Sequence, residues 1–216
     1  FPGSFPEKLK TEQTGNPIRA DICDLPAPEN RMAAHQGDLR LLVIGGSLGA
    51  QALNEVLPQA IPLLPVESHP AIWHQAGQSK VAAPRQAYAN AKVEARVEPF
   101  IADMAEAYGW ADLVICRAGA LTISELAAAG VGAILVPYPH AVDDHQTRNA
   151  LYLTEAGAAR LILQSELTPE VLANVLRDLL SGGREGLVKM AAAARRLAKP
   201  RATRQVAETC LEVMHG

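Results

Sequence analysis

The sequence predicts an α/β protein built on an open, doubly wound parallel sheet, and three observations lead to this class. About six short apolar runs that suit buried strands alternate with stretches that suit helices. Two of these runs pass directly into turns of glycine and other small residues, and each turn is followed by a helix. Hydrophobic residues make up 49% of the chain and aromatic residues only 4%, so Ala, Leu, Val and Ile must fill the core.

Residues 1–38 are rich in Pro, Gly, Asn and charged residues, and we expect a linker and surface loop with one short extended piece. Within them the sequence Gly15-Asn16-Pro17-Ile18-Arg19 predicts a turn that ends in an arginine. An arginine in a loop is usually just solvated, so this signal alone is weak. The chain begins with Phe-Pro-Gly and has neither Met nor a signal peptide, so we interpret it as the middle of a longer protein. A processed or tag-cleaved terminus is the alternative.

The first strand is predicted at residues 39–45, followed by a glycine turn at 45–50 and a helix at 51–64. This order is typical of the nucleotide-binding half of a Rossmann-like unit. The turn does not match G-x-G-x-x-G, and no acidic residue that could hold a ribose is evident about 20 residues later, which disfavours a dinucleotide. The glycines and Ser47 could still approach a phosphate or a sugar.

The next part of the chain predicts two further strands, each followed by a helix. The expected strands are 71–77 and 93–97, and the expected helices are 79–91 and 103–110. His74 lies within the first of these strands, where a histidine satisfied inside the sheet is a better interpretation than a catalyst. Phe100 and Ile101 follow the second strand, at the end where open α/β sheets bind ligands, although they could equally be two hydrophobic anchors.

The most informative stretch begins at residue 112. Val114 and Ile115 close an apolar run suited to a buried parallel strand, residues 117–120 turn the chain with little side-chain bulk, and a helix follows over 121–129. Its first N–H groups lack intrahelical partners, and the helix dipole favours an anion there. Glu125 lies one turn in, able to accept hydrogen bonds from hydroxyl groups. This pattern suits a nucleotide or nucleotide-sugar, but a ligand-free turn of an α/β domain stays an open alternative.

The remaining elements complete the alternation. We expect strands at 132–136 and 159–163 and helices at 143–156, 168–180, 185–198 and 202–214. Either Asp143 or Asp144 is expected to cap the first of these helices, and Thr168 the second, with Pro169 in its first position.

Charge and cysteine content exclude several classes. The formal net charge of −3 argues against a nucleic-acid partner. No apolar run approaches the roughly 18 residues needed to cross a bilayer. The three cysteines are far apart and have no metal-ligand spacing, so reduced cytosolic thiols are the simplest interpretation.

Several motifs, met in order along the whole chain, resemble the MurG family of peptidoglycan N-acetylglucosaminyltransferases. They are the turns at 15–19 and 45–50, the Trp73-His74-Gln75 strand, Phe100 to Met104, Cys116 to Glu125, and Asp143 to Gln146. The resemblance implies the C-terminal, donor-binding domain of a two-domain GT-B glycosyltransferase. It divides the chain into an extended segment from the N-terminal domain (1–38), a UDP-GlcNAc-binding Rossmann-like domain (39–199) and a crossing helix (200–216).

The resemblance also implies roles for individual residues. Ile101 would offer backbone groups to uracil, and Glu125 would hold the ribose hydroxyls. The diphosphate would meet Ser47 and the turn and helix start formed by Gly119, Ala120, Leu121 and Thr122, with Arg19 adding positive charge. Gln146, with Asp144 or His145, would bind the GlcNAc hydroxyls. No catalytic residue is assigned, because the base is expected in the absent N-terminal half.

The implied reaction is an inverting transfer of GlcNAc from UDP-GlcNAc to undecaprenyl-pyrophosphoryl-MurNAc-pentapeptide, which converts lipid I to lipid II. Neither a cofactor nor a metal is expected, and the chain has no D-x-D pair. The missing half would bind lipid I and the inner-membrane surface, which implies a cytoplasmic, peripheral enzyme and an inactive isolated chain. Two alternatives remain: a separate donor-binding subunit that needs a membrane partner, and a non-catalytic nucleotide-sugar-binding or regulatory module.

Overall fold

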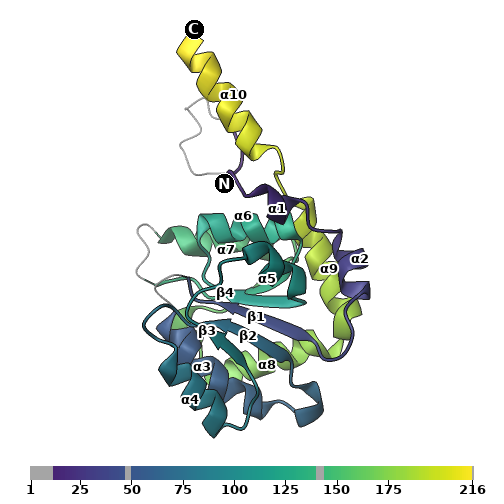
Figure 1. The fold of residues 1–216 in the computed structure, drawn as a ribbon, viewed down its shortest axis with the longest axis vertical. Helices are drawn as coiled ribbons and strands as arrows, with labels where there is room; N and C mark the ends of the chain where they lie inside the picture. Colours follow the sequence, from purple (N-terminus) through teal and green to yellow (C-terminus); the bar gives the residue numbers. More distant parts are fainter. Residues whose placement is uncertain (1–11, 47–49, 140–143, 216) are drawn as a thin grey trace.

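The computed structural model describes residues 12–46, 50–139 and 144–215, and its centre is a six-stranded, fully parallel sheet (Figure 1). The strand order is β3-β2-β1-β4-β5-β6. The strands are β1 Arg40–Ile44, β2 Ala71–Gln75, β3 Arg96–Glu98, β4 Leu113–Cys116, β5 Gly132–Leu135 and β6 Ala159–Leu161. This arrangement confirms the predicted doubly wound parallel sheet, and its strand order reverses between β1 and β4.

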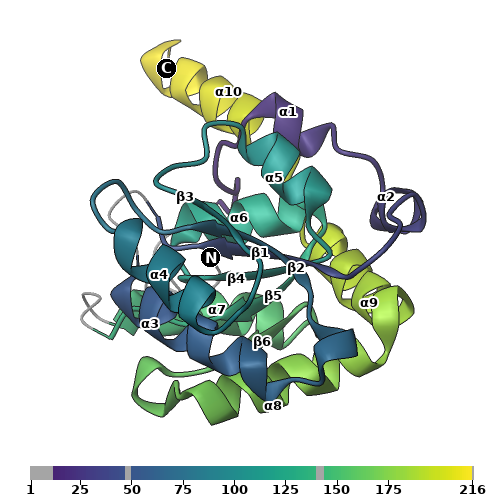
Figure 2. The ribbon, with the colours of Figure 1, turned by 60° about the horizontal axis from the view of Figure 1, so that its bottom comes forward.

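Helices cover both faces of the sheet. One face carries α3 Gln51–Ala60, α4 Ala82–Asn90 and α8 Pro169–Ser181, which Figure 2 brings forward. The other carries α5 Met104–Trp110, α6 Ala120–Ala129 and α7 His145–Thr154 (Figure 1). Helix α9, Gly183–Arg196, packs on both α8 and α6 and so joins the two layers. Short 3₁₀ turns lie at Ile61–Leu63, Val66–Ser68 and Gln164–Glu166 (η4).

The core has two apolar clusters, one on each face, because successive residues of a strand point to opposite sides. In β1, Leu41 and Val43 join the cluster under α3 and α8, and Leu42 and Ile44 join the one under α5 and α6. All four side chains are buried. Burial on both faces explains why the strands are continuous apolar runs and not alternating patterns.

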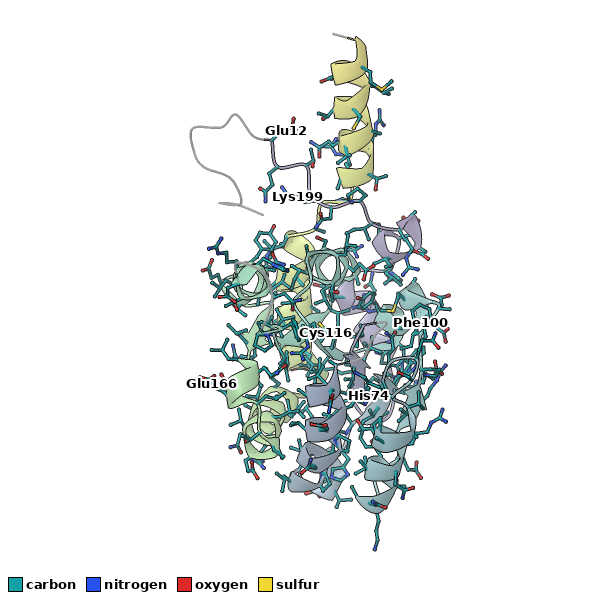
Figure 3. All side chains as sticks on the ribbon, turned by 90° about the vertical axis from the view of Figure 1, so that its left-hand side faces the viewer. Glu12, His74, Phe100, Cys116, Glu166 and Lys199 are labelled. Carbon is teal, nitrogen blue, oxygen red and sulfur yellow. The ribbon has the colours of Figure 1, made fainter. Side chains whose placement is uncertain are left out.

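The central pair of strands sets the edge at which the glycine turns emerge. Ile44 of β1 lies opposite Cys116 of β4, each the last residue of its strand. The turns after residues 44 and 116 therefore leave the same edge of the sheet, as the sequence predicts. Figure 3 looks onto this carboxyl edge, with Cys116 near the centre and Phe100 to one side.

Most predicted elements are confirmed, with shifted ends. The third strand begins at Arg96 and not at residue 93, because Lys92 has a positive φ of 55° and the Val93 N–H still bonds to the end of α4. At α8, Thr168 is the N-cap and accepts a hydrogen bond from the Val171 N–H, as expected.

The prediction that residues 1–38 form only loop and extended structure is wrong. Two short helices occur there, α1 Ala20–Cys23 and α2 Pro28–Ala33. Their helical form comes from tertiary packing, since Ile22 and Met32 are fully buried in the two core clusters. The division of the chain at residue 38 stays a prediction.

Helix α10, Ala202–His215, projects away from the sheet domain (Figure 1). Leu211 is 53% exposed and Met214 is 76% exposed, so apolar side chains of this helix face solvent. Its role as a crossing helix stays a prediction. Among the described residues, no helix combines the length and apolar character that a membrane span needs.

Candidate functional site at the carboxyl edge of the sheet

The amino-terminal end of α6 presents unpaired backbone donors. Gly119 is the N-cap in an extended conformation, and no side chain caps the helix. Ile123 donates the first backbone bond back to Gly119, at 2.9 Å. The three preceding N–H groups have no intrahelical acceptor, and Ala120 and Leu121 are exposed. An anion could therefore reach these donors and the positive end of the helix dipole.

Glu125 lies one turn further along α6 and is held by a buried tyrosine. The Tyr108 hydroxyl donates to Glu125 Oε2 at 3.0 Å. Burial raises the pKa of Glu125, while the bond from Tyr108 and the charge of Arg19 act to lower it. Because Tyr108 occupies one carboxylate oxygen, the other is available to accept from the hydroxyls of a sugar.

Arg19 reaches this site from the N-terminal segment. It is exposed and occupies the N-cap position of α1. Its charge acts to lower the pKa of both Glu125 and Tyr108, so the guanidinium lies within electrostatic range of the carboxylate. The segment is attached to α6 by Asn16, whose Nδ2 donates to Ser124 Oγ at 2.9 Å.

Ile101 lies in the loop after β3 and is 2% exposed. Its N–H donates to Oε1 of Gln75 at 3.2 Å, and Gln75, the last residue of β2, is 3% exposed. A base that binds the Ile101 N–H must therefore replace the Gln75 side chain at that donor.

The third group of predicted residues begins α7. The Tyr138 N–H donates to Gln146 Oε1 at 3.0 Å. Asp144 occupies the N-cap position with a φ of 52°, but its side chain accepts from the Thr147 hydroxyl at 2.6 Å and not from a helix N–H. His145 is exposed. Asp144 therefore occupies the predicted N-cap position but forms no capping hydrogen bond to the backbone. Asp143, the other predicted cap, lies outside the described residues.

The predicted residues share one edge of the molecule. Ile101 follows β3, Gly119 to Glu125 follow β4, and Gln146 follows β5, and carboxyl ends of parallel strands lie together. Gln146 also lines a pocket of about 640 Å³ with Arg117, Tyr138, Gln164 and Lys80 among its walls. Ser47 lies outside the described residues. The ligand contacts of all these residues stay predictions.

Sequence reasoning missed three residues that hold the site. Tyr108 has no signal, because it lies inside an apolar helix, whereas Gln75 is a polar residue that ends a buried strand. Arg117 joins the loops: its Nη1 donates to the carbonyls of Val136 at 3.1 Å and Pro137 at 3.2 Å, and its Nη2 to Gln164 Oε1 at 2.6 Å. Burial lowers the pKa of Arg117.

His74 belongs to the fold and not to the site. It is fully buried, with Nδ1 3.0 Å from the Tyr88 hydroxyl and Nε2 3.0 Å from Asn54 Oδ1. Burial lowers the pKa of His74 to about 4. These contacts confirm the interpretation of a histidine satisfied within the sheet.

Known proteins match this sequence along most or all of its length. Residues 40–206 match the family model described as the glycosyltransferase family 28 C-terminal domain. A relative from Marinobacter nauticus is 57% identical over 216 residues, and one from Nitrosococcus oceani is 52% identical over 216 residues. Both are named UDP-N-acetylglucosamine--N-acetylmuramyl-(pentapeptide) pyrophosphoryl-undecaprenol N-acetylglucosamine transferase. The matches cover 100% of this chain but only 59% and 60% of those relatives.

Solved structures agree on the fold. A crystal structure of MurG from Acinetobacter baumannii superposes with a TM-score of 0.85 at 44% identity, and the match covers 98% of this chain and 58% of that one. A glycosyltransferase from Rickettsia africae superposes with a TM-score of 0.64 at 16% identity, covering 91% of this chain and 55% of that one, which shows the fold alone.

Proposed function

Because the chain belongs to the glycosyltransferase family 28 C-terminal domains, we propose that it is the donor-binding half of an enzyme that transfers GlcNAc from UDP-GlcNAc to a lipid-linked acceptor. The uncapped start of α6 with Glu125 one turn behind it carries this proposal. It offers anion donors and a hydroxyl acceptor within one helix, which are the two groups that a nucleotide diphosphate requires.

The proposed contacts follow the geometry of the edge. The N–H groups of Ala120, Leu121 and Thr122 bind the diphosphate, with Ser47 and Arg19 adding donors. Glu125 accepts from the ribose hydroxyls through the oxygen that Tyr108 leaves unused. Ile101 binds the uracil edge. Gln146 binds the sugar, together with Asp144 or His145.

The donor half has a clear chemical task in the reaction. Departure of UDP from the anomeric carbon places negative charge on the diphosphate. Fixed N–H dipoles and an arginine stabilise that charge better in the transition state than in the ground state, and they need no reorganisation. The residues at the edge thus suit a metal-independent transfer, and the base that activates the acceptor hydroxyl would come from the other half of the enzyme.

The names of the relatives suggest the acceptor. They specify an N-acetylmuramyl-(pentapeptide) pyrophosphoryl-undecaprenol, so we extend the proposal to conversion of lipid I to lipid II in peptidoglycan synthesis. A polyprenyl acceptor resides in a membrane, so the whole enzyme would act as a peripheral protein on the cytoplasmic face of the inner membrane.

Calorimetric titration of the chain with UDP-GlcNAc, UDP-GalNAc and UDP in EDTA tests the proposal. We expect UDP and UDP-GlcNAc to bind without metal, and UDP-GalNAc to bind more weakly than UDP-GlcNAc. Binding that appears only with magnesium or manganese would contradict the metal-independent site. Turnover after addition of an amino-terminal half would distinguish a catalytic domain from a non-catalytic nucleotide-sugar module.

A further inference from the structure

Asn16 connects two parts of the chain that are far apart in sequence. Its Nδ2 donates to Ser124 Oγ at 2.9 Å and to the Ala120 carbonyl at 3.3 Å. Ser124 Oγ in turn donates to the same Ala120 carbonyl at 2.9 Å. One amide group therefore fastens the N-terminal segment to the first turn of α6, directly beside the proposed diphosphate donors.

Gly15 allows a second close approach of the segment, to residues at and before the start of α10. It has a φ of 88°, and a Cβ built on it would lie 2.7 Å from Lys199 Cβ and 3.2 Å from Ala202 Cβ. Only glycine tolerates both this conformation and this proximity. Glu12 and Lys199 line the same pocket, and Figure 3 shows both on the side of the molecule from which α10 projects. The segment thus contacts both the start of α6 and the turn that leads into α10.

Arg19 follows this double attachment by three residues. Arg19 is exposed, and its side chain forms no hydrogen bond with other residues that the structure describes. The position of its guanidinium therefore depends on the backbone of residues 15–19. Its charge acts on Glu125 one turn into α6. Because side chains as long as arginine lose much rotamer freedom when ordered, a fixed backbone lowers the entropy cost of bringing the guanidinium to a ligand.

We propose that Asn16 is a positioning residue, which holds segment 15–19 against the first turn of α6 so that Arg19 stands beside the diphosphate of the bound donor. The inference rests on the proposed function, because it needs a diphosphate at the start of α6. It gives a role to Gly15 and Asn16, for which the sequence predicts no contact with the ligand.

The test is a binding cycle on the 216-residue chain with UDP and uridine as the two probes. The variants are Asn16→Ala, Arg19→Ala, the double variant, and Asn90→Ala as a control at the exposed end of α4. We expect Asn16→Ala and Arg19→Ala each to weaken UDP binding roughly 10- to 100-fold, the size of one hydrogen bond to a charged group. The double variant should lose no more than Arg19→Ala alone. Uridine, which lacks the diphosphate, should bind all four proteins as it binds the unmodified chain.

Each other outcome contradicts a specific claim. If Asn16→Ala binds UDP with unchanged affinity and unfolds at the same temperature as the unmodified chain, the positioning role is overturned. Losses that add fully in the double variant also overturn it, because the two residues would then act independently. Equal loss of UDP and uridine indicates general damage to the site and overturns it as well. If the unmodified chain does not bind UDP, the proposed function itself fails.

Discussion

The two ends of α6 differ in whether side chains of the protein cap their free backbone groups. At its carboxyl end Gly130 turns with a φ of 63°, and Arg31 donates to the carbonyls of Ala129 at 2.7 Å and Gly130 at 2.6 Å. Arg195 donates to the Ala128 carbonyl. At its amino end no side chain caps the helix. Two cations thus satisfy the negative end of the dipole within the protein, whereas the positive end is open to a ligand.

The same contrast extends across the sheet. At the amino edge the fully buried carboxylate of Asp112 lies 2.7 Å from His35 Nδ1, and accepts from the Arg40 N–H at 3.0 Å and Arg184 Nε at 3.1 Å. The Asp112 carboxylate at the amino edge is therefore paired within the protein, whereas the start of α6 at the carboxyl edge has no side-chain cap. If the proposed donor site is correct, stability and binding depend on opposite edges of the sheet, so they should respond to different substitutions.

The largest expected effect is at the amino edge. Asp112→Ala should lower the free energy of unfolding by about 3–5 kcal/mol, because it removes the fully buried acceptor that His35, the Arg40 N–H and Arg184 share. UDP affinity of the protein that remains folded should stay unchanged. Urea unfolding and calorimetry at low temperature measure the two quantities. A loss below about 1 kcal/mol, or a selective loss of UDP binding, would break the comparison.

His74 is a possible exception to this division between the edges. It lies in β2 near the carboxyl edge, but its contacts stabilise the fold. Burial lowers the pKa of His74 to about 4 in the folded protein. Between about pH 4 and 6.5 the imidazole is therefore protonated in the unfolded chain and neutral in the folded chain. The stabilising contribution is complete above about pH 6.5 and is lost as the pH falls toward 4, by up to about 3 kcal/mol.

The measurement is urea unfolding of the unmodified chain and of His74→Gln between pH 7 and pH 4. The variant should show a flatter dependence on pH, even if its stability at pH 7 is lower. His69→Gln, at a half-buried position outside the sheet, is the matched control and should keep the steep dependence. Equal slopes for all three proteins would exclude His74 as the source.

Substitution of Glu125 should weaken UDP binding and leave stability largely unchanged, the reverse of the effect expected at Asp112. Glu125→Ala is expected to weaken UDP binding by about 1.5–3 kcal/mol, the range for hydrogen bonds to a charged group. Its raised pKa means that the folded protein holds the ionised carboxylate less readily than the unfolded chain does. That penalty is absent at acid pH and develops as the pH rises through the folded pKa, so Glu125→Gln should be at least as stable as the unmodified chain at pH 7.

Glu94→Ala provides the control for Glu125, because Glu94 is exposed and lines a hollow at the amino edge. It should change neither UDP affinity nor stability by more than about 0.5 kcal/mol. Should Glu125→Ala behave like Glu94→Ala, the carboxylate is an ordinary helix residue and the ribose role is wrong.

The fold was predictable because its signals are local. Continuous apolar runs identified the strands, and small residues after Cys116 identified the start of α6. Helices α1 and α2 were missed because tertiary burial of Ile22 and Met32 outweighs weak local signals in a Pro- and Gly-rich segment.

The support of the site was not predictable in the same way. Tyr108 meets Glu125 across two helices, Gln75 meets Ile101 from another strand, and Asn16 meets Ser124 from 108 residues away. Such pairs leave no periodic pattern in one sequence. The candidate ligand residues, by contrast, follow strands whose ends could be placed, so their shared edge was within reach of the sequence.

Helix α10 gives the smallest expected effect, because it belongs to neither edge. Leu211 and Met214 are exposed, and α10 projects from the domain (Figure 1). A solitary helix of this length is marginal in water. Its amides should therefore open with a free energy below about 1 kcal/mol, whereas those of β1 should open only with global unfolding. Hydrogen exchange on the dilute monomer measures both. If residues 203–213 are protected as well as residues 41–44, α10 is docked on this domain, and the proposal that it crosses to an amino-terminal half loses its physical basis.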